Sequence, residues 1–222
     1  MNRAGRLQTA RRIASREHAV VHRVAALLLE YPTQELLDLL PALRGAVGEL
    51  DPRLGAPLTG VLDHLAATPL GELEAQYVTT FDLKRKHALY LTYYAYGDTR
   101  KRGVALVEIK QAYRAAGFEL TEAELPDHLA VVLEFAATGD REVGLRLLLE
   151  HRAGLELLRL ALVDGRSPYA GALVAVSATL PPLEGEEREA VALLAAQGPP
   201  GEEVGLEPFA PPSYMPSTGA RR

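Results

Sequence analysis

Apolar residues recur at intervals of three and four along most of this chain, which is the spacing of an amphipathic α-helix. Val20, Val24, Leu27 and Leu28 form one such stripe, and it ends at Tyr31-Pro32 because a residue before proline resists the α conformation. We expect helices over roughly 15–30, from 33 through a break or kink at Pro41, and over 52–67, 70–81, 104–117, 126–137, 141–163, 169–180 and 184–197.

The amino-acid composition also predicts a helical protein. Hydrophobic residues make up 48% of the 222 positions, Leu and Ala dominate them, and no convincing strand is visible. We therefore expect an all-α fold, a single globular bundle of about nine or ten short helices. Residues 15–197 would form this domain, after a basic lead-in at 1–14 and before a flexible, Pro- and Gly-rich tail at 198–222.

Charge and residue usage exclude several classes. A formal net charge of −5 argues against a nucleic-acid partner, and the absence of Cys excludes disulfides, thiolate catalysis and Cys-bound metals. His18 and His22 have a spacing that suits a metal, but no third ligand is evident, so no metal is expected. No signal peptide and no long apolar run occurs, so we expect a cytoplasmic protein without direct membrane insertion.

The segment from Tyr77 to Asp98 is dense in aromatic and charged residues, with six of the chain's thirteen Phe and Tyr. Tyr77 and Phe81 are four apart, as are Tyr90 and Tyr94, so on helices each pair would share a face. Tyr has an apolar ring and a polar tip, which suits a half-buried surface that meets a partner. Two interpretations remain open: the rings fill the core at a helix corner, or they line a binding surface.

A second segment, 124–137, begins with ELPDH. Pro126 suits the first helical position, and Asp127 would then lie in the first turn, where a carboxylate interacts favourably with the helix dipole. Asp127 and His128 could also form an acid–base pair with Glu124 or Glu134, which makes a small hydrolase one alternative function. No nucleophile motif, phosphate loop or dinucleotide fingerprint accompanies them, so a binding role is favoured over catalysis.

Three segments occur in order: YVTTFDLKRKHALYLTYYAYGDTRKRGVAL, then AGFEL, then ELPDHLAVVLEF. Together they resemble the nitrate reductase molybdenum-cofactor assembly chaperones of the NarJ type, within the TorD-like group of redox-enzyme maturation proteins. The resemblance covers about residues 72–137, and LLLEYP at 27–32 is similar to the family's first-helix ending. ELPDH matches the wider group's E-P-x-D-H motif with Leu and Pro transposed.

The resemblance implies an all-helical chaperone with no catalytic residues, no metal and no cofactor of its own. Its partner would be the catalytic (alpha) subunit of respiratory nitrate reductase, bound through that apo subunit's N-terminal peptide until the molybdenum cofactor is inserted. The chaperone would not remain in the finished enzyme. A chaperone for another molybdoenzyme, of the dimethyl-sulfoxide-reductase type, and a structural helical adaptor are further alternatives.

The client peptide would lie as an amphipathic helix in an apolar groove. The tyrosine rings would supply the groove, and carboxylates would meet basic groups on the peptide. The expected client-binding residues are Tyr77, Phe81, Asp82, Tyr90, Tyr93, Tyr94, Glu124, Asp127 and His128.

Overall fold

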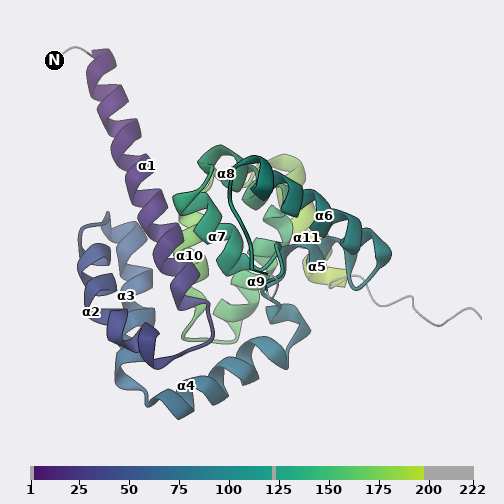
Figure 1. Ribbon diagram of the computed structural model, residues 1–222, viewed down its shortest axis with the longest axis horizontal. Helices are drawn as coiled ribbons and strands as arrows, with labels where there is room; N and C mark the ends of the chain where they lie inside the picture. Colours follow the sequence, from purple (N-terminus) through teal and green to yellow (C-terminus); the bar gives the residue numbers. More distant parts are fainter. Residues whose placement is uncertain (1–2, 122–123, 198–222) are drawn as a thin grey trace, which may run out of the picture.

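The computed structural model describes residues 3–121 and 124–197, and helices dominate both ranges (Figure 1). The α-helices in these ranges are α1 Arg3–Leu28, α2 Gln34–Gly48, α3 Pro52–Ala67, α4 Leu70–Tyr77, α5 Leu91–Tyr96, α6 Arg100–Ala115, α7 Leu129–Thr138, α8 Arg141–Glu150, α9 Arg152–Asp164, α10 Ala170–Ala178 and α11 Gly185–Gln197. A π-helical turn, Val78–Asp82, follows α4, and a 3₁₀ turn, Arg85–His87, precedes α5. No strand forms in the described ranges, so the all-α prediction is confirmed.

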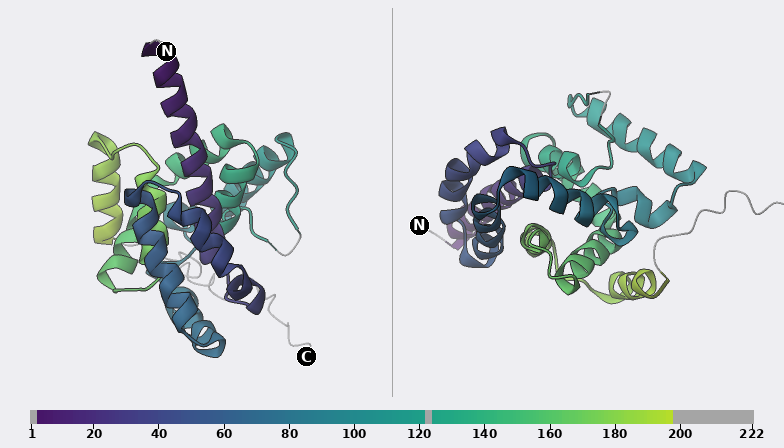
Figure 2. Two further views of the ribbon diagram at one scale, coloured as in Figure 1. Left: turned by 90° about the vertical axis from the view of Figure 1, so that its left-hand side faces the viewer. Right: turned by 90° about the horizontal axis from the view of Figure 1, so that it is seen from below.

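Helix α7 lies at the centre of the core. Seven of its ten residues are buried, as expected of a helix that is apolar on all sides. It packs between α1 and α8, while α10 packs against α3, α9 and α1. The N-terminal turns of α1 project from this body, as two directions of view show (Figure 1, Figure 2). Each fully buried Leu or Phe in the core contributes about 2 kcal/mol relative to an exposed one.

Several helix boundaries follow from local capping and agree with the sequence. Thr33 caps α2, since its hydroxyl oxygen accepts a hydrogen bond from the Leu36 amide at 3.3 Å. Asp51 caps α3, with Pro52 as the first helical residue. Asp140 caps α8 by accepting from two backbone amides. These short-range contacts fix where the chain enters each helix.

Several boundaries differ from the prediction, among them the start of α1 and the interior of the helix expected over 141–163. α1 begins at Arg3, so most of the expected lead-in is helical. The single helix expected over 141–163 is two helices, α8 and α9, with a break at His151. The break turns α9 so that Gly154 packs against Tyr94 of α5, where a Cβ at position 154 would lie 2.7 Å from the Tyr94 Cβ. A tertiary contact therefore overrides the continuous helical pattern.

Two further expectations concern the C-terminal tail and membrane-spanning helices. The tail at 198–222 lies outside the described residues, so its flexibility stays a prediction. Among the helices of the described ranges, none combines the length and apolar character needed to cross a bilayer.

Candidate functional site

Tyr90 and His128 form a close antiparallel pair at the surface, although they lie 38 positions apart in the sequence. Two backbone hydrogen bonds, of 3.0 and 2.7 Å, bracket the pair and join the segment before α5 to the segment before α7. Opposite residues in such a bracketed pair place their side chains on the same face. The two rings accordingly meet edge to face, with centroids 5.3 Å apart.

This pairing corrects the predicted start of α7. The helix begins at Leu129 rather than at Pro126, and His128 is the residue that precedes it. The Asp127 carbonyl accepts a hydrogen bond from the Leu91 amide at 3.0 Å, which holds the segment extended. The expectation that Asp127 lies in the first helical turn is therefore wrong, and a helix dipole does not explain its carboxylate.

The Asp127 side chain is instead completely buried. One carboxylate oxygen, Oδ2, accepts from the Thr92 hydroxyl at 2.5 Å and from the Thr92 amide at 3.3 Å. The other, Oδ1, has no hydrogen-bond partner among the described residues. A buried carboxylate is costly unless it is paired, so a nearby cation is required.

Arg102 of α6 supplies that cation, and the sequence did not single it out. Its Nη2 lies 3.6 Å from Asp127 Oδ2, its Nη1 contacts Asp98 at 2.7 Å, and its Nε donates to the Thr92 hydroxyl oxygen at 3.3 Å. The same guanidinium lies over the Tyr90 ring, 5.4 Å from its centroid, as a cation–π contact. The only available signal was the spacing of Asp98 and Arg102, four apart at the start of a helix.

Three predicted site residues are core residues. Tyr77, Phe81 and Tyr94 are all buried, and the Tyr77 and Phe81 rings pack with centroids 4.8 Å apart. The Tyr77 hydroxyl donates to the Leu29 carbonyl, and the Tyr94 hydroxyl donates to the Ala88 carbonyl, both at 2.9 Å. These rings support the surface from beneath and are not available as direct contacts for a peptide.

The expected pairing of Tyr90 with Tyr94 on one face is also wrong. Tyr90 precedes α5 and is 36% exposed, whereas Tyr94 lies inside α5 and is 2% exposed. Tyr93 is half-buried beside Tyr94, with ring centroids 5.9 Å apart. Asp82 and Glu124 are exposed, and His128 is half-buried. The structure thus leaves Asp82, Tyr90, Tyr93, Glu124 and His128 accessible.

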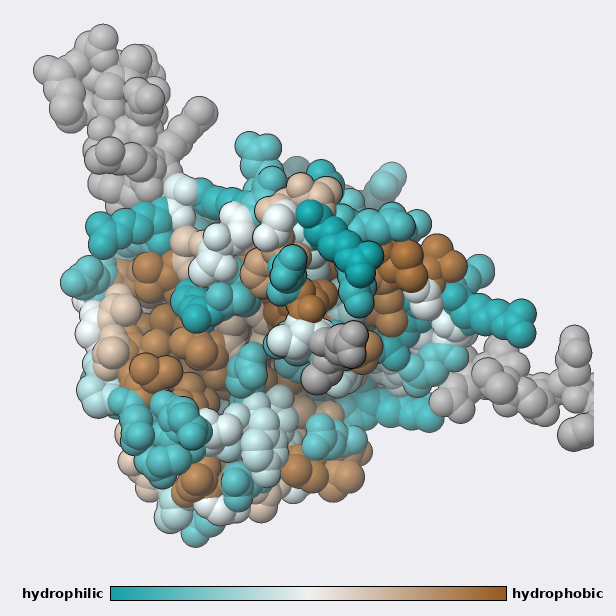
Figure 3. Space-filling model, viewed as in Figure 1, coloured by the Kyte–Doolittle hydropathy of each residue, from teal (hydrophilic) through white to brown (hydrophobic). Residues whose placement is uncertain are grey.

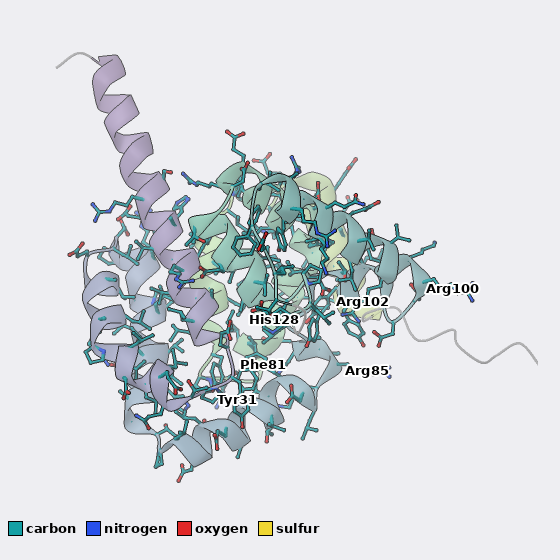
Figure 4. All side chains as sticks on the ribbon, viewed as in Figure 1. Tyr31, Phe81, Arg85, Arg100, Arg102 and His128 are labelled. Atoms are coloured by element: carbon teal, nitrogen blue, oxygen red, sulfur yellow. The ribbon has the colours of Figure 1, made fainter. Side chains whose placement is uncertain are left out.

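Two exposed apolar residues extend this accessible set. Tyr31, at the end of α1, packs its ring 5.4 Å from that of Tyr77 and remains largely exposed. Leu125 is also exposed, and its carbonyl accepts from the His128 amide at 3.1 Å. We call Tyr31, Tyr90, Leu125 and His128 the Tyr90–His128 face. Hydrophobic residues reach the surface in several places on this side of the molecule (Figure 3), and the labelled Tyr31, His128 and Arg102 lie in succession from the end of α1 towards α6 (Figure 4).

Three carboxylates neighbour residues of this face or the rings beneath it, since Glu30 precedes Tyr31, Glu124 precedes Leu125, and Asp82 follows the Phe81 ring that packs on Tyr77. Burial raises the pKa of Tyr77 well above its usual value, and the charges of Asp82 and Glu30 raise it further. Burial likewise raises the pKa of Glu30, with Glu124 as the next contribution. Three acidic side chains, Glu30, Asp82 and Glu124, therefore border the exposed aromatic residues and favour a ligand with basic groups.

His128 is electrically neutral at neutral pH. Burial lowers the pKa of its imidazole, and this effect outweighs the opposite influence of Asp127 and Glu124. No hydrogen bond joins Asp127 to His128 in the described residues, since the Asp127 carboxylate is bonded to Thr92. The acid–base pair of the hydrolase alternative is therefore not assembled, and the described residues hold no cluster of three or more metal-ligating side chains.

Comparison with known proteins shows which family the sequence matches. The family described as nitrate reductase delta subunit matches residues 47–175. A nitrate reductase-like protein, NarX of Mycobacterium tuberculosis, is 40% identical over 164 residues, which cover 72% of this chain and 24% of that protein. The chain thus spans about a quarter of the length of NarX.

Two relatives are named as chaperones. Bacillus subtilis NarJ, a probable nitrate reductase molybdenum cofactor assembly chaperone, is 33% identical over 154 residues, 69% of this chain and 84% of that protein. Escherichia coli NarJ, a nitrate reductase molybdenum cofactor assembly chaperone, is 32% identical over 154 residues, 66% of this chain and 64% of that protein. These names agree with the expectation that the chain is not an enzyme.

The fold has a solved counterpart in an Archaeoglobus fulgidus protein assigned as a redox enzyme maturation protein. The two structures superpose with a TM-score of 0.51 at 20% identity, over 81% of this chain and 93% of the other. At this identity the similarity concerns the fold alone. The family match covers more than half of the chain, including both segments that form the Tyr90–His128 pair, and the chain therefore belongs to the nitrate reductase delta subunit family.

Proposed function

We propose that this protein is a cytoplasmic chaperone that binds the N-terminal segment of the apo catalytic subunit of respiratory nitrate reductase. In this role it supports insertion of the molybdenum cofactor and assembly of the enzyme, and it is absent from the finished complex. The chaperone role is supported by the names of the NarJ relatives. The observation that carries the location of the binding site is the exposed Tyr90–His128 pair on a buried polar base.

The buried polar network beneath the Tyr90–His128 pair favours binding because it holds the Tyr90 side chain in a fixed orientation. Asp127, Thr92 and Arg102 join the segment before α7, the start of α5 and the start of α6 by hydrogen bonds and an ion pair. Arg102 also contacts the Tyr90 ring from α6. A preorganised aromatic side chain loses little conformational freedom on binding, which is the property of an interface anchor.

The charge around the pair supports a peptide of particular chemistry. Exposed rings at Tyr31 and Tyr90 and the exposed Leu125 would cover the apolar side of an amphipathic segment. Glu30, Asp82 and Glu124 would meet its basic side chains. A client segment with apolar residues at helical spacing and Lys or Arg between them fits both requirements.

Co-purification tests this proposal. The chain, expressed with the nitrate reductase catalytic subunit, should retain that subunit and lose it when the subunit's N-terminal segment is deleted. The catalytic subunit of a dimethyl-sulfoxide-type reductase provides the comparison for the alternative client. Equal retention with and without the N-terminal segment would refute the proposed contact, and preferential retention of the other reductase would refute the proposed client.

A further inference from the structure

Helix α6 presents an unusual outer face. Arg100, Val104, Val107, Gln111 and Arg114 follow one another at intervals of four, three, four and three, so they share one side of the helix. Val104 and Val107 are 61% and 55% exposed, although both are poor helix formers and apolar. The opposite side, with Ala105, Ile109 and Tyr113, is buried. We call the first set, with Lys110 beside it, the outer face of α6.

The charge of α6 is opposite to that of the protein. The helix holds five of the chain's 24 Lys and Arg residues and one of its 29 acidic residues, in a chain of net charge −5. Its acidic residue, Glu108, is exposed four residues after Val104 and borders a groove of about 380 Å³ between α6 and α8. Arg100, Lys110 and Arg114 are exposed and flank the two valines. Basic charge and apolar surface are thus concentrated together.

We propose that the outer face of α6 binds the surface of an anionic phospholipid bilayer. The two valines would enter the headgroup region, and Arg100, Lys110 and Arg114 would pair with lipid phosphates. The Arg102 guanidinium is not part of this face, because it is engaged by Asp98, Thr92 and Tyr90. The protein would therefore associate peripherally with a membrane while its Tyr90–His128 face remains free for a client.

The shape of the face favours a bilayer over a second peptide. Peptides are held in concave grooves, where both sides of an apolar side chain are covered. Val104 and Val107 are exposed on α6, and the labelled Arg100, at the start of this helix, lies at one end of the molecule (Figure 4). A flat, deformable surface can cover Val104 and Val107 without a groove, whereas Lys110 and Arg114, nearer the end of α6, also border a hollow of about 450 Å³ beside Phe118 and Glu119.

Vesicle flotation tests the proposal. The full chain should float with vesicles of phosphatidylcholine and phosphatidylglycerol in equal parts, and not with pure phosphatidylcholine. Neutralising one basic residue, as in Arg100→Gln or Lys110→Gln, should weaken binding about fivefold. The double variant Val104→Ser, Val107→Ser should weaken it about tenfold. Binding should also fall as salt concentration rises.

Insertion can be observed directly, because the chain has no Trp. A single Val107→Trp variant should show a blue shift of fluorescence with anionic vesicles, and Val163→Trp, at another exposed position, should not. Val163→Ser, in α9, and Arg53→Glu, in α3, are controls outside α6 and should float like the wild type. Equal flotation with both lipids, no flotation, or unchanged flotation of the α6 variants would overturn the proposal. Loss of catalytic-subunit retention by those variants, with flotation unchanged, would identify a protein-docking face instead.

Discussion

The guanidinium carbon of Arg102 lies 5.4 Å from the centre of the Tyr90 ring, while its Nη2 lies 3.6 Å from a carboxylate oxygen of Asp127. One side chain therefore joins an exposed aromatic residue to a completely buried acid. Because Asp127 also accepts two hydrogen bonds from Thr92, the orientation of Tyr90 depends on groups inside the fold. The buried acid in this family motif thus has a positioning role rather than a catalytic one.

Replacing Asp127 should destabilise the fold far more than replacing Asp98, although Arg102 contacts both. Asp127→Ala removes a buried carboxylate and leaves Thr92 and Arg102 without a partner there, which should cost about 3 kcal/mol of the free energy of unfolding. Asp98 is half exposed, so Asp98→Ala should cost less than about 1 kcal/mol. Urea unfolding of the two variants measures the difference, and similar losses would show that Asp127 is not the anchor of this network.

Two Gly→Ala variants, one at the contact between α9 and α5 and one at an open position on α3, should have opposite effects on stability. A Cβ at position 154 would lie 2.7 Å from the Tyr94 Cβ, so Gly154→Ala should force the helices apart and cost about 1–3 kcal/mol. Gly60 lies within α3 with no atom near its Cβ position, so Gly60→Ala should stabilise the protein by up to about 1 kcal/mol. Thermal unfolding checks both signs. A neutral Gly154→Ala would mean that the α8–α9 break has another cause.

These contacts also show how far the sequence could predict the structure. Thr33, Asp51 and Asp140 act on amides within three residues, so the starts of α2, α3 and α8 were predictable from local pattern. The start of α7 depends on Thr92, 35 residues away from Asp127, and no local pattern contains that information. The break at His151 likewise depends on packing between α9 and Tyr94.

The burial of the candidate site residues was also only partly predictable, because it depends on long-range contacts. Tyr90 and Tyr94 are the same residue type at helical spacing, and their different burial follows from where α5 begins, at Leu91. Arg102 acquires its role only when the segment around Asp127 folds against α5 and α6. Motif resemblance indicated the family, which the match over residues 47–175 confirms, whereas the division between core and surface residues required the three-dimensional contacts.

His22 should make the free energy of unfolding depend on pH. Burial lowers the pKa of His22 to about 4, and its Nε2 lies 2.8 Å from the Thr179 hydroxyl oxygen. That hydroxyl donates to the Val176 carbonyl, so it accepts from a neutral His22 that carries its proton on Nε2. The unfolded chain, with an ordinary histidine pKa near 6.5, binds a proton first as the pH falls. The contribution of neutral His22 to stability should be fully present above about pH 6.5. The free energy of unfolding should then fall by up to about 3 kcal/mol towards pH 4.

The variant His22→Gln isolates this contribution. Glutamine can still donate to Thr179 but does not titrate, so the slope of unfolding free energy against pH should decrease. Burial also lowers the pKa of His18, His87, His128 and His151, but those residues are the same in both proteins. Unfolding curves at several pH values compare the two. Identical slopes would assign the acid sensitivity to other histidines.

Client binding should weaken in acid through His128. Burial lowers the pKa of His128, so the imidazole is neutral at pH 7 and gains a proton only below its ordinary value of about 6.5. Protonation adds a positive charge to a face that attracts basic groups, which opposes a basic client segment. Peptide titrations between about pH 5.5 and 8 should show this loss in the wild type and a flatter profile in His128→Gln. Parallel profiles would exclude His128 as the titrating group.

The most direct test of the account is a calorimetric titration with the N-terminal peptide of the nitrate reductase catalytic subunit, on the wild type and on Tyr90→Ala. Leu193→Ala, at an exposed apolar position on α11, is the matched control. Truncation of a central aromatic anchor typically costs on the order of 2 kcal/mol, so Tyr90→Ala should bind at least about tenfold more weakly with its melting temperature unchanged. Leu193→Ala should bind as the wild type does. Equal affinity of the wild type and a folded Tyr90→Ala would contradict the assignment of the Tyr90–His128 face as the client-binding site.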